Sequence, residues 1–362
     1  MRWLVDARSM VDPSGGGVSR VGRGLIEAFI AVAANDAIVL ATTGWAASSP
    51  ATALNTIGKR DPASCGDKQQ AARDARVHIY IPNKLWSAAC LSGLTSLDRV
   101  VEKRAGKIGS VFLPNIGFVG PMKRPYVLLL HDLSFLIEPE WFPRKMRWWH
   151  RAVGAAKLIR GAAHLLAVSE TTKRDAVRLL GIPPERITVL PIGPTLIPLP
   201  TGLPAYRPTA SPYILALGWG DPRKNTATAI AAVDGLRRDP AFSDLQLIIV
   251  GRDVVRPSDT ELASLYANAA AFLYPSWYEG YGLPLHEAAS FGTPCVASTA
   301  GALTETAPPG TFFADPAKPH HWVEALRIAL TFPRPVPIDP NPDAWLHAAK
   351  ILHTTLDSVA KH

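Results

Sequence analysis

Short apolar runs alternate with helical segments through most of this 362-residue chain. Runs such as Tyr126–Leu130 are continuously apolar, which is typical of strands buried on both faces of a parallel sheet. The segment Val21–Ala33 between two such runs predicts a helix. The alternation therefore predicts an α/β fold built from βαβ units. Seven strands are predicted in the first half: Trp3–Asp6, Ile38–Ala41, Val77–Ile81, Val111–Pro114, Tyr126–Leu130, His164–Val168 and Ile187–Pro191.

A proline-rich stretch, residues 191–212, separates this block from a second one and predicts a linker. The chain length also favours two domains. A polar loop is predicted over residues 42–75, and a second break over Pro333–Pro342 precedes a helix at about Asp343–Ala360. The expected domains are residues 1–205, 206–342 and a terminal helix, 343–362. Strands in the second block are predicted at Tyr213–Gly218, Leu245–Val250, Ala271–Tyr274, Cys295–Ala297 and Gly310–Phe313.

Two glutamates eight positions apart, Glu279 and Glu287, carry the most informative chemistry. The run 271–276 predicts a buried strand, and residues 285–291 predict a helix ended by Gly292. Glu279 is therefore expected on the loop at the strand's carboxyl end, and Glu287 in the first turns of the helix. Backbone N–H groups of the intervening glycines and the positive helix end suit a diphosphate, and the carboxylates suit sugar hydroxyls.

A structural explanation of the same segment also exists. A strand, a glycine-rich turn and a helix with an acidic residue near its start are common in α/β proteins. The residues around the two glutamates favour the functional interpretation.

The segment 275–298, which contains Glu-Gly-Tyr-Gly-Leu-Pro-Leu-His-Glu, resembles the signature of family 4 glycosyltransferases. These are retaining enzymes with two Rossmann-like domains, the GT-B architecture. Other segments that resemble the family follow in the expected order along nearly the whole chain. They are Trp3–Arg8, the Gly15–Gly17 loop, His131–Leu133, Ala167–Glu170, Val189–Gly193, Tyr213–Gly218 and Arg223–Asn225.

The resemblance implies a GT-B fold: two Rossmann-like, doubly wound domains facing across a cleft, with the terminal helix crossing back to the first domain. It also implies the site. Glu279 would hold donor-sugar hydroxyls, Glu287 the ribose, and Arg223 and Lys224 the diphosphate, with His131 near the donor sugar. The remaining donor-binding residues would be Gly280, Tyr281, Gly282, Leu283, Gly218 and Trp219, and the acceptor-side cleft loop would contain Gly15, Gly16, Gly17 and Arg20.

Two departures from the family pattern matter. Trp219 stands where the family often has an arginine, so either Arg223 and Lys224 hold the diphosphate between them or Trp219 stacks on a base or sugar. Near residues 252–260 one αβ unit of the donor domain is missing, which predicts a smaller sheet and an edge that a partner could cover.

Simpler roles remain open for several of these residues. An Arg-Lys pair on a loop can be merely solvated, His131 can be structural, and Asp132 can cap the following turn. The Gly15–Gly17 loop matches neither a Walker loop nor a dinucleotide fingerprint, because Arg23-Gly24 follows Gly22 and Gly-x-Gly-x-x-Gly fails at Arg20. It can equally be a flexible first turn.

Net charge is +8, and no acidic residue occurs between Glu140 and Glu170. Tryptophans are interleaved with the basic residues of segment 144–160, which is either a solvated helix face or a surface for anionic membrane lipid. Nucleic acid is disfavoured, because zinc-finger spacing, an RNA-recognition signature and basic-zipper heptads are all missing. Cys65, Cys90 and Cys295 are odd in number and far apart, which indicates reduced thiols.

The start of the sequence lacks signal-peptide features, and no apolar run is long enough to span a bilayer. We therefore expect a cytoplasmic protein, peripheral at the inner face of the membrane. No Asp-x-Asp or His/Cys metal cluster occurs, so we expect no cofactor and no metal.

The expected function is transfer of a hexose from a sugar nucleotide to a lipid-linked glycan. GDP-mannose is the first expected donor, and a UDP-hexose is the second. One alternative is a related two-domain enzyme that uses a sugar phosphate or another acceptor. The other is a catalytically silent sugar-nucleotide-binding or scaffold protein on the same fold.

Overall fold

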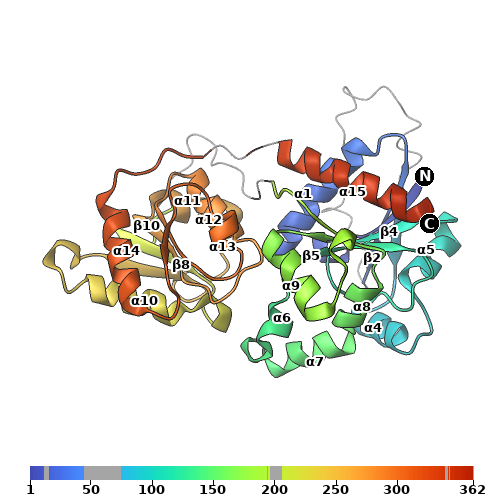
Figure 1. Cartoon of the computed structure of the whole chain (residues 1–362), viewed down its shortest axis with the longest axis horizontal. Coiled ribbons are helices and arrows are strands. Elements are labelled where there is room, and N and C mark those ends of the chain that lie inside the picture. Colours follow the sequence, from blue (N-terminus) through green and yellow to red (C-terminus); the bar gives the residue numbers. More distant parts are fainter. Residues whose placement is uncertain are drawn as a thin grey trace.

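The structure is a computed structural model that describes residues 1–11, 16–44, 75–193, 195, 206–338, 341 and 343–361. Two α/β lobes lie side by side, each around its own sheet (Figure 1). Most of the predicted polar loop 42–75 and half of the predicted linker 191–212 lie outside the described residues.

The N-terminal lobe contains a seven-stranded sheet in the order β3-β2-β1-β4-β5-β6-β7. Neighbouring strands pair in parallel throughout, as their continuous apolar runs predict. Its strands are β1 (Arg2–Asp6), β2 (Ala37–Thr43), β3 (Ala75–Ile79), β4 (Ser110–Leu113), β5 (Tyr126–Leu130), β6 (His164–Ala167) and β7 (Ile187–Val189). Its helices are α1 (Gly17–Val32), α4 (Asn83–Leu91), α5 (Leu97–Ala105), α6 (Ser134–Ile137), α7 (Arg144–Ala152), α8 (Ala155–Gly161) and α9 (Glu170–Leu180).

The C-terminal lobe contains a five-stranded parallel sheet in the order β12-β11-β10-β8-β9. Between β9 and α11 the chain has only a loop with an isolated bridge from Val250 to Val254. The strands are β8 (Tyr213–Leu217), β9 (Gln246–Val250), β10 (Ala271–Tyr274), β11 (Cys295–Ser298) and β12 (Phe312–Ala314). The helices are α10 (Thr226–Leu236), α11 (Asp259–Asn268), α12 (Leu283–Ser290), α13 (Leu303–Thr306) and α14 (Pro319–Thr331).

The last helix, α15 (Asp343–Lys361), packs on the N-terminal lobe rather than on the lobe that precedes it in sequence (Figure 1). Leu352 and Leu356 are fully buried in one cluster with Leu25 and Phe29 of α1. The hydroxyl of Ser110 on β4 donates to the carbonyl of Leu356. The predicted crossing back of the terminal helix is therefore confirmed, as are all twelve predicted strands within a residue or two at their ends.

Helix α1 begins at Gly17, four residues earlier than predicted. Gly16 has an extended conformation (φ −67°, ψ 178°), and its carbonyl accepts hydrogen bonds from the N–H groups of Ser19 and Arg20. This is the geometry of a helix N-cap. Gly17 and Arg20 therefore lie in the first helical turn, and their prediction as part of a loop is wrong. Gly15 lies outside the described residues.

Among the helices that the structure describes, none combines the length and hydrophobicity needed to cross a lipid bilayer.

Candidate functional site

Glu279 and Lys224, which come from different loops of the C-terminal lobe, form an ion pair. The Lys224 Nζ lies 2.7 Å from Glu279 Oε1. Lys224 follows β8 and Glu279 follows β10, and these strands are neighbours in the sheet. The carboxyl ends of neighbouring parallel strands meet at one edge, where open α/β sheets bind ligands. The structure thus brings two of the predicted catalytic residues together.

Tyr274 is a second hydrogen-bond partner of Lys224. Its hydroxyl accepts a hydrogen bond of 2.8 Å from Lys224 Nζ. Burial, together with the negative charge of Glu279, raises the pKa of Tyr274, so its hydroxyl stays protonated. The Lys224 ammonium is fixed between a carboxylate and a phenol, with about a fifth of its side chain exposed. This arrangement can present a fixed positive charge to an anion.

Arg223 reaches across to the N-terminal lobe. Its guanidinium contacts Asp221 at 2.8 Å and Asp132 of the N-terminal lobe at 3.4 Å. It also lies over the ring of Phe142, 5.1 Å from the centroid. Burial opposes its charge, but the adjacent carboxylates prevail and raise the pKa of Arg223. Arg223 and Lys224 are therefore adjacent cations with separate carboxylate partners.

His131 follows β5 and has its ring tied to backbone. Its Nε2 lies 2.8 Å from the carbonyl oxygen of Pro114. A carbonyl only accepts, so Nε2 carries the proton of the neutral ring. Burial lowers the pKa of His131, which keeps that ring uncharged. Asp132 caps the following turn through Ser134 N–H at 3.0 Å, as its sequence position allows.

Gly280 lies where the two lobes touch. A Cβ at this position would fall 1.8 Å from the carbonyl oxygen of His131, so only glycine permits this approach. Thr172 donates to the Gly280 carbonyl at 3.4 Å, and the Tyr278 hydroxyl donates to Asp175 at 2.5 Å. The loop that carries Glu279 is thus docked on the N-terminal lobe.

Glu287 is 5% exposed and bound from three directions. Its Oε1 lies 3.2 Å from Arg20 Nη1 of the N-terminal lobe and accepts from the Thr195 hydroxyl at 2.8 Å. Its Oε2 accepts from the buried Tyr266 hydroxyl at 3.1 Å. Arg20 also pairs with Asp259 at the start of α11. Sequence reasoning predicted Glu287 and Arg20 separately and missed Thr195, Tyr266 and Asp259.

The starts of α1 and α12 face each other. A Cβ on Gly17 would lie 3.0 Å from Leu283 at the start of α12, whereas one on Gly16 would meet nothing within 4 Å. Gly282 precedes α12 with φ +97°, a conformation that favours glycine. Tyr281 stacks on His286 with ring centroids 5.0 Å apart. The predicted segment 280–283 is therefore well packed at the contact between the lobes.

Gly218 and Trp219 occupy the end of β8. Gly218 has φ +87°, and a Cβ there would lie 2.4 Å from Lys224 Cγ, so the glycine makes room for that side chain. Trp219 is 47% exposed, and the Arg252 guanidinium lies 5.3 Å from its ring centroid. Arg252 was not among the predicted site residues.

A cavity of about 430 Å³ adjoins the Glu287 cluster between α12 and the segments that connect the lobes. His286 lies in its wall, and its buried Nε2 has no hydrogen-bond partner among the described residues. Burial lowers the pKa of His286. The lining includes Gly193, Thr195, Tyr281, His286, Glu287 and Asn341.

In the part of the chain that the structure describes, no group of three or more His, Cys, Asp and Glu side chains is arranged to hold a metal ion. Metal-independent activity stays a prediction.

Comparison with known families agrees with the two-lobed geometry. Residues 211–331 match the family described as Glycosyl transferases group 1, and residues 108–194 match Glycosyltransferase Family 4. The chain thus contains glycosyltransferase domains of the group 1 and family 4 types. The family predicted from the sequence is thereby confirmed.

A curated relative, O-antigen chain mannosyltransferase B of Escherichia coli, is 31% identical over 225 residues, which is 52% of this chain and 57% of the relative. The chain thus spans little more than half the length of that relative. Among solved structures, sucrose-phosphate synthase from Thermosynechococcus elongatus has a TM-score of 0.61 at 17% identity, covering 100% of this chain and 96% of its own. Anabaena HepE in complex with UDP-glucose has a TM-score of 0.58 at 16% identity, with 100% and 97% coverage. The GT-B fold is confirmed.

Proposed function

We propose that this glycosyltransferase moves a hexose from a sugar nucleotide to a glycan with retention of configuration. The observation that carries the proposal is the pair of carboxylates Glu279 and Glu287 at the contact between the lobes, each bound to a cation. Lys224 lies 2.7 Å from Glu279, and Arg20 lies 3.2 Å from Glu287. When a donor binds, the carboxylates can accept hydrogen bonds from its hydroxyls, and the cations that they hold can turn to its phosphates.

The proposed roles follow from charge and position. Arg223 and Lys224, with the N–H groups of residues 280–283, would stabilise the diphosphate that leaves as an anion. Glu279 would bind hydroxyls of the sugar, and Glu287 those of the ribose. Burial lowers the pKa of His131, so its ring is a weak base and poorly suited to take the acceptor proton. The leaving phosphate would then take the acceptor proton.

Mannose is the favoured sugar. The curated relative from Escherichia coli is named a mannosyltransferase, and its match to this chain is at 31% identity. GDP-mannose is therefore the first donor to test. A UDP-hexose is second, because HepE was solved with UDP-glucose.

The acceptor we propose is a lipid-linked glycan in the assembly of O-antigen or another polysaccharide. Support comes from the relative named for the O-antigen chain and from the basic surface of α7. That surface would place the protein at the cytoplasmic face of a membrane rich in anionic lipid. No metal should be required, since Arg223 and Lys224 supply positive charge, and EDTA should leave turnover unchanged.

A donor panel tests the proposal. Purified protein would be incubated with GDP-mannose, UDP-glucose, UDP-galactose and UDP-N-acetylglucosamine. Thermal shift reports binding, and release of the nucleoside diphosphate reports turnover. We expect a selective shift and turnover with one donor. A catalytically silent binding protein would give a selective shift without turnover, and neither signal with any donor would refute the proposal.

A further inference from the structure

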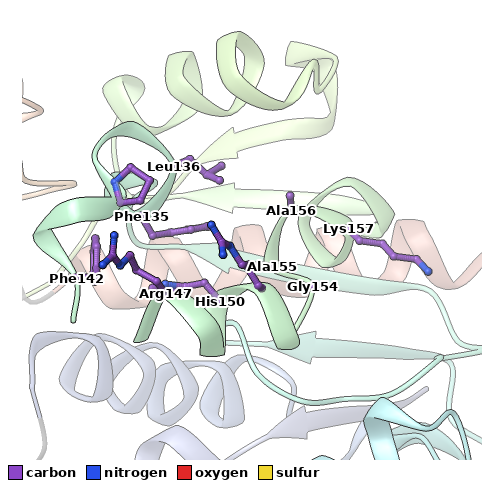
Figure 2. A pocket seen from close by; sticks show the side chains of 11 residues that line it. Phe135, Leu136, Phe142, Arg147, His150, Gly154, Ala155, Ala156 and Lys157 are labelled. Carbon is purple, nitrogen blue, oxygen red and sulfur yellow. The ribbon is translucent and has the colours of Figure 1, made fainter. Parts of the chain in front are cut away.

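A second cavity, of about 400 Å³, lies in the N-terminal lobe away from the Glu287 cluster. It is enclosed by α6, the short 3₁₀ helix η2 (Pro139–Trp141), α7 and the start of α8 (Figure 2). Phe135 and Leu136 form part of its wall, together with Phe142. Figure 2 shows Phe142, Arg147 and His150 grouped at one end of this cavity and Lys157 at the other.

The apolar wall is rigidly packed. The Phe135 ring stacks on His150 with centroids 4.6 Å apart and an interplanar angle of 19°. Phe142 meets the same imidazole edge-on at 5.3 Å. Phe135 is 9% exposed, so its position is fixed by the core of the lobe. The cavity therefore presents a preformed aromatic and aliphatic surface, which is typical of a binding site for an apolar group.

The rim is strongly basic and not neutralised. Arg147, Arg151 and Lys157 line the cavity, and no carboxylate is among the described residues that do so. Arg144, Arg147 and Arg151 are spaced by three and four residues, so they share one face of α7. They also line an adjacent hollow with Trp148, which is 64% exposed. None of these cations forms an ion pair with any described carboxylate.

Phe142 lies between the cavity and the candidate active site. It lines the cavity, and the guanidinium of Arg223 lies 5.1 Å from its ring centroid. Arg223 in turn contacts Asp132, which follows the site residue His131. A molecule anchored in this cavity would thus lie one side chain away from Arg223, at the contact between the lobes where the donor is proposed to bind.

We propose that this cavity anchors the acceptor by its lipid phosphate. The apolar wall of Phe135, Leu136 and Phe142 takes the first part of the hydrocarbon chain, and Arg147 with Arg151 takes the phosphate or diphosphate. Guanidinium groups bind phosphate oxygens through paired, charge-assisted hydrogen bonds, and an arginine face without carboxylates is complementary to that dianion. That the bound lipid phosphate is the acceptor rests on the proposed function. That the cavity binds a lipid phosphate at all does not.

The test uses the full chain and farnesyl phosphate below its micelle concentration, with calorimetry as the readout. Farnesol and inorganic phosphate, measured in parallel, separate the contributions of chain and phosphate. We expect only farnesyl phosphate to bind, and Arg147→Ala or Arg151→Ala to weaken its binding roughly tenfold each. Lys145→Ala is the matched control, because it removes one positive charge from the same helix and Lys145 lines neither hollow.

A second variant, Ala156→Phe, places bulk in the cavity without changing charge, and it should abolish binding of the same probe. Circular dichroism and thermal unfolding confirm that each variant is folded. Equal losses in Arg147→Ala and Lys145→Ala would overturn the proposal, because they would indicate attraction by net charge alone. Binding of inorganic phosphate as tight as that of farnesyl phosphate would overturn it as well, since the chain would then play no part.

Donor binding is measured separately by thermal shift with sugar nucleotides. Normal donor turnover together with no binding of farnesyl phosphate would refute the acceptor site and leave the proposed function intact. Binding of farnesyl phosphate that depends on Arg147, together with no donor turnover, would confirm the site and refute the transferase proposal.

Discussion

The guanidinium of Arg20, on the first turn of the N-terminal lobe's α1, lies 3.2 Å from the carboxylate of Glu287 in the C-terminal lobe. The two residues are 267 positions apart in sequence. Glu287 is the carboxylate proposed to bind the donor ribose, so a ribose hydroxyl and Arg20 would share the same carboxylate. The contact therefore couples the approach of the lobes to the site of the nucleotide.

Replacing Arg20 by alanine tests this coupling. Glu287 is 5% exposed, and without Arg20 its charge would be balanced only by hydroxyl donors. We expect the free energy of unfolding to fall by about 1–3 kcal/mol. Chemical denaturation measures the change, and Arg23→Ala on the same helix is the control, since its guanidinium donates to the Met10 carbonyl at 3.3 Å and not to a carboxylate of the other lobe among the described residues. Equal effects of the two substitutions would contradict a special role for the contact with Glu287.

Glu279→Gln keeps the shape of the side chain and removes its charge. Turnover should fall by roughly two orders of magnitude or more, because contacts made in the transition state would be lost. The variant should remain folded, since Gln can still accept from Lys224. Nucleoside diphosphate release measures the rate, with Glu324→Gln on the exposed surface of α14 as the control. Unchanged turnover in Glu279→Gln would remove this residue from the catalytic machinery.

Gly280→Ala should hold the lobes apart. The added Cβ would fall 1.8 Å from the His131 carbonyl, a backbone atom that has little room to move. We expect a larger radius of gyration by small-angle X-ray scattering and turnover reduced about tenfold or more, since misplaced groups lose catalytic alignment. Gly109→Ala is the control, because its Cβ would make ordinary contacts at 3.5 Å. Wild-type scattering and activity in Gly280→Ala would show that the observed contact is dispensable.

Stability should fall as pH decreases from about 7.5 to 5.5. Burial lowers the pKa values of His131, His164 and His286. Below the unfolded value of about 6.5 the unfolded chain binds protons that the folded chain does not, so the unfolding free energy declines until the folded pKa values are passed. Thermal unfolding across this range measures the decline.

The matched variants for pH dependence are His131→Gln and the exposed His347→Gln. Gln retains a donor for the Pro114 carbonyl and does not titrate, so His131→Gln should show a shallower decline. The same slope in His131→Gln and wild type would exclude His131 as a source of the pH dependence.

The strands were predictable because each is a short apolar run between turn residues. Runs such as Tyr126–Leu130 have one plausible structure in an α/β chain. The start of α1 was not predictable in the same way. Gly16 caps it through backbone geometry alone, without a side-chain hydrogen bond, so no residue type marks the boundary.

The sequence identified several residues of the candidate site, but not the contacts that these residues make with one another. Glu279 was recognised by its spacing from Glu287, and Lys224 by the resemblance to the family. Their pairing across 55 residues depends on β8 and β10 being neighbours. Tyr266 resembled an ordinary core residue of a helix, and only the folded chain shows its hydroxyl bound to Glu287. Contacts between elements that are distant in sequence are set by three-dimensional geometry, which periodicity does not encode.

The position of α15 has a consequence for how this protein is made. Leu352 and Leu356 complete an apolar cluster that also holds Trp3, Leu25 and Phe29 from the beginning of the chain. The whole C-terminal lobe is translated between these two groups of residues. Until α15 has been synthesised, the apolar residues of α1 in this cluster therefore lack the partners that cover them in the complete chain.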